Sequence, residues 1–339
     1  MAQLIDVTLR DGGYVNRFDF SLEAAKHIVS GLQKAGVDWI EIGYRNGPAK
    51  GTTGLGMTAA TDDDYIAALK EFTPLSNLVV MFHPDNIQVE DLQSLKRLGV
   101  SLVRVCIRQD CLEEGLDTIR ACKRIGLFTS ANFVRITYFT SQELRQMTQK
   151  AEEAGADIVY FADSNGHLVP DQVKSIATIL KSTLTIPVGF HAHNNLSLGL
   201  ANTVAALELG VDWIDSSLRG MGRSGGNLAT EVYAAYIERC FGVKNLKLVE
   251  VMEAAEFVQD KVLLSEHCTT PMIKDILFGL MNFSTDLKQS IMDASREYNV
   301  NWKQLAYRIG INSSNKITSE GIAFTASQIS KNNIELQHM

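Results

Sequence analysis

The chain has 339 residues, of which 45% are hydrophobic and 21% are charged, and its formal net charge at pH 7 is -7. This composition is typical of a globular protein with a sizeable core, and the absence of a Lys/Arg cluster argues against a nucleic-acid partner. There is no signal-peptide pattern and no run of the ~18 apolar residues that a membrane span needs, so we expect a cytoplasmic protein without a membrane partner.

Short β-rich segments alternate along the chain with segments long enough for crossover helices. Their nearly continuous apolar runs are typical of parallel strands that are buried on both faces. The predicted strands are residues 4–9, 37–45, 77–83, 101–108, 127–134, 157–164, 187–193 and 212–220. Eight such units are the count of a TIM barrel, so the predicted fold class is α/β with a (β/α)8 barrel.

The segments between the predicted strands carry helix signals. Ser21 is a predicted N-cap, and the helix after it has one apolar face, formed by Ala25, Ile28, Leu32 and Ala35. Thr140 and Glu143 have the spacing of a capping box at the start of another helix. No further βα alternation follows Cys240, so we expect a barrel over residues 1–244 and a helical C-terminal domain over residues 245–339.

The five cysteines show no CxxC spacing and are odd in number, which argues against a disulfide framework or a zinc cluster. We expect them to be buried or incidental thiols, because free cysteine packs as a small hydrophobic residue. They are Cys106, Cys111, Cys122, Cys240 and Cys268.

The seventh predicted strand ends in FHAHNN, which holds two histidines two residues apart. Residues at i and i+2 of a strand point to the same side, so His191 and His193 are expected to share a face. Active sites of TIM barrels lie at the carboxyl ends of the strands. We therefore expect the two imidazoles to bind one metal ion, and the alternative is a pair of hydrogen-bonded core histidines.

Asp11 follows the first predicted strand and supplies the carboxylate that two histidines lack. Alternate strands of a TIM barrel contribute to common layers of side chains, so the first and seventh strands can meet. Two histidines and one aspartate leave coordination positions open, which favours Mn²⁺, Mg²⁺, Co²⁺ or Fe²⁺ over a closed structural zinc site. Arg10 beside Asp11 is either a surface ion pair or a cation that stabilises an enolate oxygen near the metal.

The eighth predicted strand leads into RGMGRSGGNLATE, a loop with G-x-G-x-x-G spacing. It follows the last βα unit instead of opening a Rossmann half, so a dinucleotide site is not predicted. We interpret it as a loop that lets a substrate approach the backbone and carries Asn227 towards the metal. A plain flexible turn is the alternative.

Together, DVTLRDGG, FHAHNN and GNLATE resemble the DRE-TIM metallolyase superfamily, which includes the HMG-CoA lyases, the isopropylmalate-type synthases and the 4-hydroxy-2-oxovalerate aldolases. The resemblance covers about residues 3 to 240. It implies that Asp11, His191 and His193 bind a divalent metal, with Mn²⁺ or Mg²⁺ expected. It also implies that Asn227 lies at or beside the metal and that Arg10 stabilises the enolate.

Within this superfamily the chain resembles the 4-hydroxy-2-oxovalerate aldolase branch. It lacks the acidic residue that follows RDG in the acyl-CoA condensing synthases and the cysteine of the lyases, and its segment ASREYNVNWKQLAYRIG is similar to the helical domain of the aldolases. The resemblance implies a carbon–carbon lyase, a class II-type pyruvate aldolase, that cleaves or forms a 4-hydroxy-2-oxo acid from pyruvate enolate and an aldehyde. The alternatives are a Claisen-type condensing acyltransferase, which joins an acyl-CoA to a 2-oxo acid, and a non-catalytic barrel.

The catalytic base is open at this point. Tyr14 stands where the related aldolases have a histidine shortly after RDG, and a nearby Arg10 and metal would lower its pKa from about 10. His167 follows the sixth predicted strand and is the second candidate, because imidazole titrates near neutrality. For both residues the alternative is substrate contact or packing.

Further substrate contacts and partners follow from the same resemblance. Tyr44 and Arg45 end the second predicted strand and are expected to bind the far end of the substrate. Ser164, at the end of the sixth, is a further predicted substrate-binding residue. We expect a 2-oxo acid and an aldehyde as small-molecule partners, and a homodimer. Aldolases of this branch pair with an aldehyde dehydrogenase, but the C-terminal sequence of this chain gives no support for that partner.

Overall fold

The computed structural model describes residues 2–49, 51–72, 77–243, 245–263, 272–312 and 317–337. Cys268 lies outside these ranges. Of the four cysteines within them, Cys106 and Cys122 are buried, Cys111 is half-buried and Cys240 is exposed.

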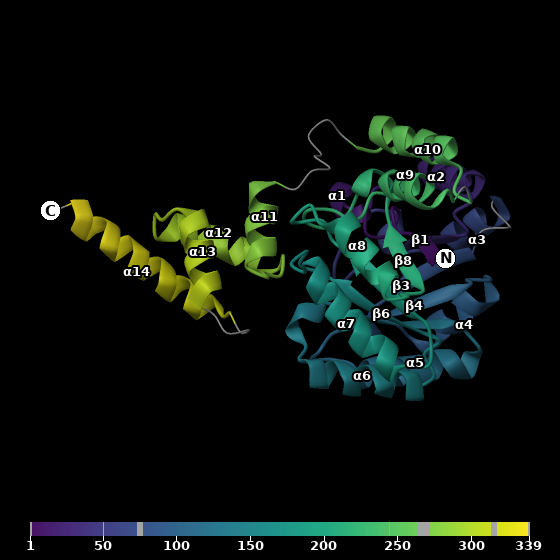
Figure 1. Cartoon of the computed structure of the whole chain (residues 1–339), viewed down its shortest axis with the longest axis horizontal. Helices are drawn as coiled ribbons and strands as arrows, with labels where there is room; N and C mark the ends of the chain where they lie inside the picture. Colours follow the sequence, from purple (N-terminus) through teal and green to yellow (C-terminus); the bar gives the residue numbers. More distant parts are fainter. Residues whose placement is uncertain are drawn as a thin grey trace.

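The eight predicted strands form a closed parallel barrel in which each strand pairs with its neighbours in chain order and the first also pairs with the last (Figure 1). The strands within the described residues are β1 (Gln3–Asp6), β2 (Trp39–Tyr44), β3 (Asn77–Phe82), β4 (Leu102–Ile107), β5 (Thr129–Phe133), β6 (Ile158–Asp163), β7 (Val188–Ala192) and β8 (Trp213–Ser216). The predicted fold class is therefore confirmed. Closure brings all eight carboxyl ends to one mouth.

Helices cover the outside of the barrel, and further helices follow it. Within the described residues they are α1 (Gly13–Asn16), α2 (Leu22–Ala35), α3 (Asp63–Phe72), α4 (Val89–Arg97), α5 (Leu112–Ile125), α6 (Ser141–Glu153), α7 (Pro170–Thr183), α8 (Gly199–Glu208), α9 (Thr230–Phe241), α10 (Leu248–Lys261), α11 (Ile273–Leu280), α12 (Leu287–Glu297), α13 (Trp302–Asn312) and α14 (Ser319–Gln337). Short 3₁₀ helices are η1 (Met57–Ala59), η2 (Pro84–Asn86), η3 (Ile136–Tyr138) and η4 (Leu218–Gly220).

The predicted helix signals have the structures expected of them. The Ser21 side chain accepts a hydrogen bond from the Ala24 N–H at the start of α2. The whole predicted apolar face of that helix is buried. Thr140 and Glu143 form both hydrogen bonds of a capping box at the start of α6.

β1 ends earlier than the sequence predicts, because the chain turns tightly at the barrel mouth. Three successive N–H groups share one acceptor, the Val7 carbonyl oxygen: Arg10 at 3.2 Å, Asp11 at 2.8 Å and Gly12 at 3.3 Å. A Cβ at Gly12 would lie 2.2 Å from the Thr8 carbonyl oxygen, so only glycine fits this position without a shift of the backbone. Arg10 and Asp11 therefore lie in this turn at the barrel mouth and not in a continuation of β1.

A chain of buried charges crosses the barrel interior beneath the mouth. Arg104 on β4 is fully buried and donates to Glu41 at 3.2 Å and to Asp215 at 2.8 Å. Its guanidinium also lies 4.3 Å from the centroid of the Tyr160 ring. Arg10 donates to the same Glu41 oxygen at 2.6 Å. These contacts satisfy charges that would otherwise be costly to bury.

The C-terminal helices divide into two groups. α10 packs against α2, closely enough that a Cβ at Gly31 would lie 3.0 Å from the Ala254 Cβ, and its buried face belongs to the core of the barrel layer. α11 to α14 have a separate core that includes Phe278, Ile291 and Leu305. We therefore propose a domain boundary between α10 and α11, later than the predicted position after residue 244.

The helical domain meets the barrel at its mouth and projects away from it, with α11 beside the barrel and α14 farthest from it (Figure 1). Asn282, after α11, connects the two parts: its side-chain oxygen accepts from Asn165 at 2.8 Å and from Thr137 at 2.7 Å. Two further residues, Arg135 and Arg223, pair with Asp286 at the start of α12. The barrel mouth is therefore bounded on one side by the helical domain.

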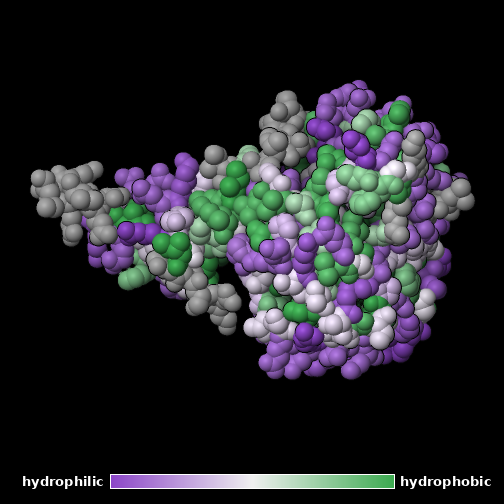
Figure 2. Space-filling view, viewed as in Figure 1, coloured by the Kyte–Doolittle hydropathy of each residue, from purple (hydrophilic) through white to green (hydrophobic). Residues whose placement is uncertain are grey.

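Apolar side chains gather on the surface of the helical domain near the barrel (Figure 2). Ile276, Leu280 and Tyr307 line a shallow apolar groove between α11 and α13, and each is at least 45% exposed. Across the described ranges, no helix combines the length and the apolar character that a membrane crossing requires.

The buried charges give a first prediction, on stability. Replacement of Arg104 by leucine is expected to lower the free energy of unfolding by about 3–5 kcal/mol, because Glu41 and Asp215 would lose a buried countercharge. Urea unfolding measures the change. The matched control is Arg120→Leu, whose side chain is 46% exposed in an ion pair with Asp117 and should change stability by about 1 kcal/mol or less. Equal effects of the two substitutions would contradict the burial argument.

Candidate active site

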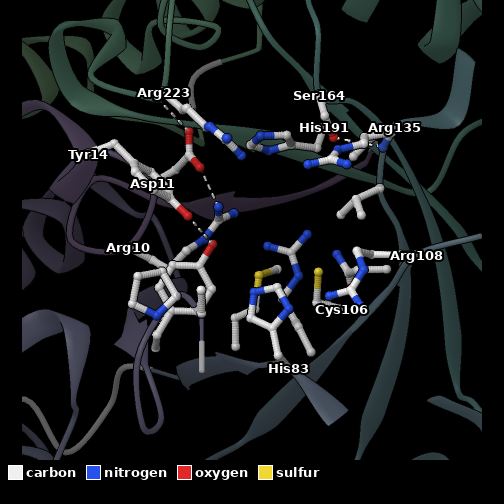
Figure 3. Close-up of a pocket in the computed structure, with 18 of the residues that line it drawn as sticks. Arg10, Asp11, Tyr14, His83, Cys106, Arg108, Arg135, Ser164, His191 and Arg223 are labelled. Carbon is white, nitrogen blue, oxygen red and sulfur yellow. Dashed lines mark hydrogen bonds and ion pairs between the residues drawn. The ribbon is translucent and has the colours of Figure 1, made fainter. Parts of the chain in front are cut away.

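A cavity of about 640 Å³ opens at the barrel mouth (Figure 3). The ends of the strands, the loop after β1, the glycine-rich loop after β8 and Asp286 of the helical domain line it. The predicted site residues that line it are Arg10, Asp11, Tyr14, Tyr44, Ser164, His191 and His193. Closure of the barrel therefore brings together residues that lie more than half the chain apart.

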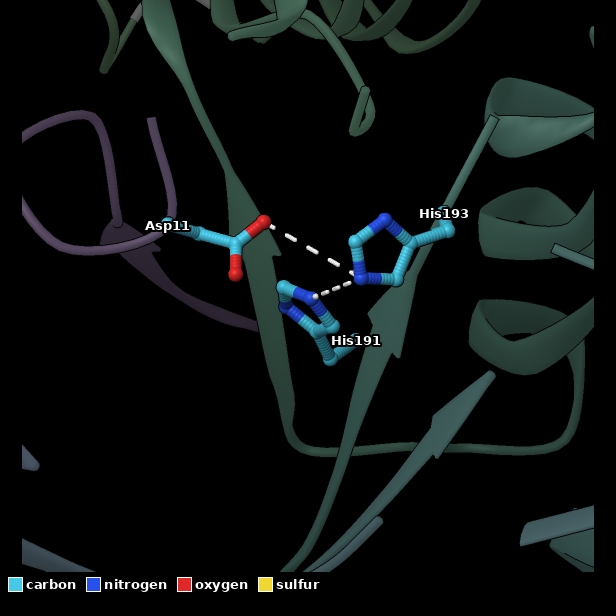
Figure 4. Close-up of side chains that lie close together, drawn as sticks. All are labelled: Asp11, His191 and His193. Atoms are coloured by element: carbon cyan, nitrogen blue, oxygen red, sulfur yellow. Dashed lines mark hydrogen bonds and ion pairs between the residues drawn. The ribbon is translucent and has the colours of Figure 1, made fainter. Parts of the chain in front are cut away.

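Asp11, His191 and His193 form a buried cluster at the inner end of this cavity (Figure 4). One ligand atom from each residue lies within 4.8 Å of the others. The Nε2 atoms of the two histidines are 3.3 Å apart, and Asp11 Oδ2 is 3.9 Å from His193 Nε2. The three side chains converge on one point, as a metal site requires.

The other ring nitrogen of each histidine is already occupied. His191 Nδ1 lies 2.8 Å from an Asp215 carboxylate oxygen, and His193 Nδ1 lies 3.1 Å from the Gly226 carbonyl oxygen. Both partners are acceptors, so the proton of each neutral imidazole is on Nδ1. Burial also lowers the pKa of His193 to about 4, despite the nearby Asp11, which keeps this ring neutral at neutral pH. Each Nε2 therefore presents a lone pair.

These observations fit a divalent ion. Two Nε2 lone pairs facing each other across 3.3 Å in a buried site repel unless a cation lies between them. A metal–nitrogen bond is roughly 2.0–2.1 Å long, so two nitrogens on one ion are at most about 4.2 Å apart, and the observed separation meets this limit. The donor set of two neutral imidazoles and one carboxylate also suits such an ion.

The Asp11 carboxylate is held on both oxygens. Arg10 donates to Oδ1 at 2.5 Å, and Oδ2 accepts from the Asn227 amide at 2.9 Å and from the Arg223 N–H at 3.2 Å. Burial opposes ionisation of Asp11, but Arg10 and His193 hold its pKa well below the usual range. Asp11 is therefore ionised and fixed in orientation.

Asn227 lies beside the predicted metal position but presents its amide nitrogen, not its oxygen, to the cluster. Its Nδ2 donates to Asp11 and to the Met221 carbonyl oxygen, both at 2.9 Å. Its Oδ1 is buried and has no hydrogen-bond partner among the described residues. A Cβ at Gly222 would lie 2.4 Å from Asn227 Nδ2, which explains a glycine in this loop. This geometry supports orientation of Asp11 by Asn227 more than direct metal binding.

Tyr14 and Tyr44 form an aromatic wall next to Arg10. Their hydroxyl oxygens are 3.4 Å apart, and Arg223 lies over the Tyr14 ring at 5.5 Å. Burial raises the pKa of Tyr14, and Arg223 offsets this rise only in part. The sequence analysis expected Arg10 and a metal to lower this pKa, and in the structure burial outweighs Arg10. Burial likewise raises the pKa of Tyr44.

Besides Asn227, two predicted site residues lie outside the cavity. Arg45 follows Tyr44 directly and, because side chains alternate along a strand, points away from the barrel axis. Its guanidinium pairs with Asp91 at 3.1 Å and Asp63 at 2.9 Å, so it stabilises the packing of neighbouring helices. His167 places Nδ1 2.8 Å from the Gly279 carbonyl oxygen of α11 and lines a separate cavity, so its geometry does not support a role as base.

Several cavity residues were not assigned to the site by the sequence analysis. They are His83, Cys106, Arg108, Arg135 and Arg223 (Figure 3). His83 is the last residue of the third predicted strand, residues 77–83. Strand-end position was the available signal for the first four, because residues that close barrel strands face the mouth. Arg223 lies in the glycine-rich loop, and only the folded loop brings it to Asp11.

The fold and the site together define a class: a (β/α)8 barrel with a buried cluster of two histidines and one aspartate at its mouth. A sequence model of the HMGL-like family matches residues 1–258. The chain belongs to the HMGL-like family, as the resemblance in its sequence indicated.

Individual relatives agree with this assignment. A 4-hydroxy-2-oxovalerate aldolase of Chloroflexus aurantiacus is 32% identical over 311 residues, which cover 91% of this chain and 89% of the relative. A protein of the same name from Roseiflexus castenholzii is 36% identical over 260 residues, 76% of each chain. The crystal structure of the N-terminal domain of a candidate aldolase from Bacteroides vulgatus superposes with a TM-score of 0.76 at 26% identity, covering 88% of this chain and 98% of that one.

The cluster gives a prediction for metal binding. His191→Ala is expected to lower the affinity for Mn²⁺ by at least roughly 10- to 100-fold. Loss of a residue that only hydrogen-bonds a metal ligand costs about this much, and His191→Ala removes a predicted ligand itself. Isothermal titration with Mn²⁺ and metal analysis of the purified protein measure this. His27→Gln is the control, because His27 is exposed and stacks on Phe257 away from the mouth. Unchanged Mn²⁺ binding by His191→Ala would contradict the site.

Proposed function

We propose that this chain is a divalent-metal-dependent aldolase that cleaves or forms a 4-hydroxy-2-oxo acid, with pyruvate as one product or substrate and an aldehyde as the other. The observation that carries the proposal is the buried cluster of Asp11, His191 and His193 next to the Arg10 guanidinium. The names of the relatives support the aldolase branch over the acyl-CoA condensing branch. Mn²⁺ or Mg²⁺ is the proposed metal, and the homodimer remains a prediction.

Asp11, His191 and His193 would hold the ion, whose chemistry when bound is that of a Lewis acid that polarises the 2-oxo group of the substrate. Asp215 keeps His191 in the required tautomer, and Asn227 keeps the Asp11 carboxylate in place. The hydrogen bonds from Asp215 and Asn227 fix the orientation of the proposed metal ligands. Ligands that are already oriented need little rearrangement during the reaction.

Arg10 is proposed to stabilise the negative charge that develops on the 2-oxo oxygen when the enolate forms. Among the described residues its hydrogen bonds use Nε, to Glu41, and Nη1, to Asp11. Nη2 is therefore available to a ligand in the cavity that Arg10 lines. A guanidinium that is fixed by two buried carboxylates is a preorganised donor, which is the arrangement that favours charge stabilisation in a transition state.

Tyr14 is proposed to hold the proton at the 4-oxygen of the substrate. In cleavage, the 4-hydroxyl loses its proton and the electron pair of the C3–C4 bond moves to C3, which gives the aldehyde and the enolate of pyruvate. In the reverse direction, the new C4 oxygen takes up a proton. Because its pKa is raised, Tyr14 is protonated at neutral pH and is in the state that donates this proton during condensation.

The proposed function predicts exchange of the pyruvate methyl protons. In D₂O with Mn²⁺, the protein is expected to exchange these protons without any aldehyde, and Asp11→Asn is expected to lower the rate by at least about 100-fold because it removes a metal ligand. Proton NMR of the methyl signal measures the rate. Asp117→Asn, on the surface of α5, is the control. No exchange with any divalent metal would refute the aldolase assignment.

The state of Tyr14 predicts how the reaction depends on pH. From pH 7 to 9, kcat/KM for cleavage is expected to rise, because the tyrosinate fraction that accepts the 4-hydroxyl proton grows as the pH approaches the raised pKa. For condensation, kcat/KM should follow the same profile, because the overall reaction neither takes up nor releases a proton. Initial rates in both directions across this range measure this. Tyr14→Phe should lower both rates by about 10²–10⁴-fold. A cleavage rate that falls between pH 7 and 9 in the unmodified protein would contradict this role.

A further inference from the structure

The cavity is larger than a short substrate requires. Its volume of about 640 Å³ is within the range of sites that hold drug-sized ligands. Since a water molecule takes up about 30 Å³ of the liquid, the cavity has the volume of roughly twenty waters. A five-carbon hydroxy-oxo acid has nine non-hydrogen atoms, so most of the space beyond the metal cluster would remain unfilled.

The wall of the cavity opposite Asp11 is polar and cationic. Arg108 follows β4 and Arg135 follows β5, so the two guanidiniums come from adjacent strands, and Figure 3 shows both on the side away from Asp11 and Tyr14. His83 and Cys106 also line the cavity, and the His83 ring stacks on Tyr44. An aldehyde that ends in a methyl group would place apolar atoms against this wall.

Arg135 is held in a strained backbone conformation at the cavity edge. Its φ of 54° and ψ of 47° lie in the left-handed region, which residues other than glycine rarely adopt. The Arg135 N–H donates to Ser164 Oγ at 2.8 Å, which fixes the conformation from the neighbouring strand end. A strained backbone conformation persists only where contacts with the surrounding structure enforce it, and such conformations are common at ligand sites.

The counter-ions of the two arginines lie at the water side of the cavity. Arg108 pairs with Asp110, whose side chain is 75% exposed. Arg135 pairs with Asp286, which is 59% exposed and shared with Arg223. Exposed ion pairs contribute little free energy, so a ligand anion can take the place of either carboxylate at low cost.

The charges at the inner end of the cavity are balanced once a divalent ion and a 2-oxo acid are bound, without any contribution from the aldehyde. Two guanidiniums, Arg10 and Arg104, lie with three carboxylates, Asp11, Glu41 and Asp215. This leaves one negative charge, which a divalent ion converts to one positive charge. The carboxylate of the 2-oxo acid then neutralises the inner end.

The charges of the outer cavity are not balanced in this way. Among the described residues that line it, four guanidiniums face three carboxylates: Arg17, Arg108, Arg135 and Arg223 against Asp85, Asp110 and Asp286. One positive charge is left over across the outer cavity, where Arg135 and Arg223 share the single carboxylate of Asp286. A neutral aldehyde would leave it uncompensated.

We propose that the aldehyde half of the substrate carries an anionic group, a carboxylate or a phosphate, and that Arg108 and Arg135 bind this group on the wall opposite Asp11. The inference rests on the proposed aldolase function and deepens it by naming the class of aldehyde. Arg108 and Arg135 are then the residues that determine specificity for the acceptor, and the planar guanidinium suits either anion through paired hydrogen bonds.

Matched aldehydes test this in the full-length protein with Mn²⁺ and pyruvate. The carboxylate pair is succinic semialdehyde and butanal, and the phosphate pair is D-glyceraldehyde 3-phosphate and D-glyceraldehyde. We expect kcat/KM for condensation to be at least tenfold higher for the anionic member of one pair, and the pair that shows this preference identifies the group. A neutral member that reacts as well as its anionic partner in both pairs would overturn the inference.

Variants locate the preference. Arg135→Gln and Arg108→Gln are each expected to reduce the ratio of kcat/KM for the preferred anionic aldehyde to that for its neutral partner by at least tenfold, and Arg135→Lys should restore part of it. Arg120→Gln, an exposed arginine on α5, is the control and should keep the ratio of the unmodified protein. A preference that survives both glutamine variants would overturn the assignment to these two residues.

Pyruvate proton exchange separates the two levels of the proposal, because it needs no aldehyde. No exchange by the unmodified protein would overturn the proposed function and this inference with it. Exchange together with equal use of charged and neutral aldehydes would overturn the inference alone.

Discussion

The arrangement of the mouth depends on two lone pairs that face each other. His191 and His193 place their Nε2 atoms 3.3 Å apart in a buried site, and each ring is fixed by an acceptor on its Nδ1. Two imidazole nitrogens that face each other in this way suit a shared cation, which is the donor arrangement of a metal centre with open positions. Asp11 completes the set because the turn after β1 holds its carboxylate at the same point. The candidate metal cluster and the turn after β1 are therefore parts of one arrangement.

The same electrostatic network extends from the barrel interior to the cluster. Asp215 accepts from both Arg104 and His191, and Glu41 accepts from both Arg104 and Arg10. Both carboxylates neutralise Arg104. In addition, Asp215 orients His191 and Glu41 orients Arg10. The cost of burying these charges is offset only when the whole set is present. Stability and ligand orientation are consequently coupled, which explains why the barrel tolerates five charged groups so close to its axis.

The ion pairs in the outer part of the cavity are more exposed than the buried network at its inner end. Arg135 and Arg223 come from separate loops and both pair with Asp286 of the helical domain. These ion pairs are half-exposed, so they position the helical domain over the mouth without closing the cavity to a ligand anion. Under the proposed function, the inner end would bind the 2-oxo acid and the outer end would select the aldehyde.

The sequence by itself determined the fold class, the eight strands, the helix caps and the three residues of the candidate metal cluster, because these depend on local periodicity and on residues that end particular strands. Its expectations for Arg45 and His167 did not hold in the structure, since neither lines the cavity. Tertiary structure alone decided that a tight turn after β1 fixes Asp11, that burial raises the pKa of Tyr14, and that Asn227 presents its nitrogen. It also decided which arginines line the cavity. The physical reason is that side-chain direction, burial and pairing depend on neighbours far away in the sequence, and local sequence patterns do not contain those neighbours.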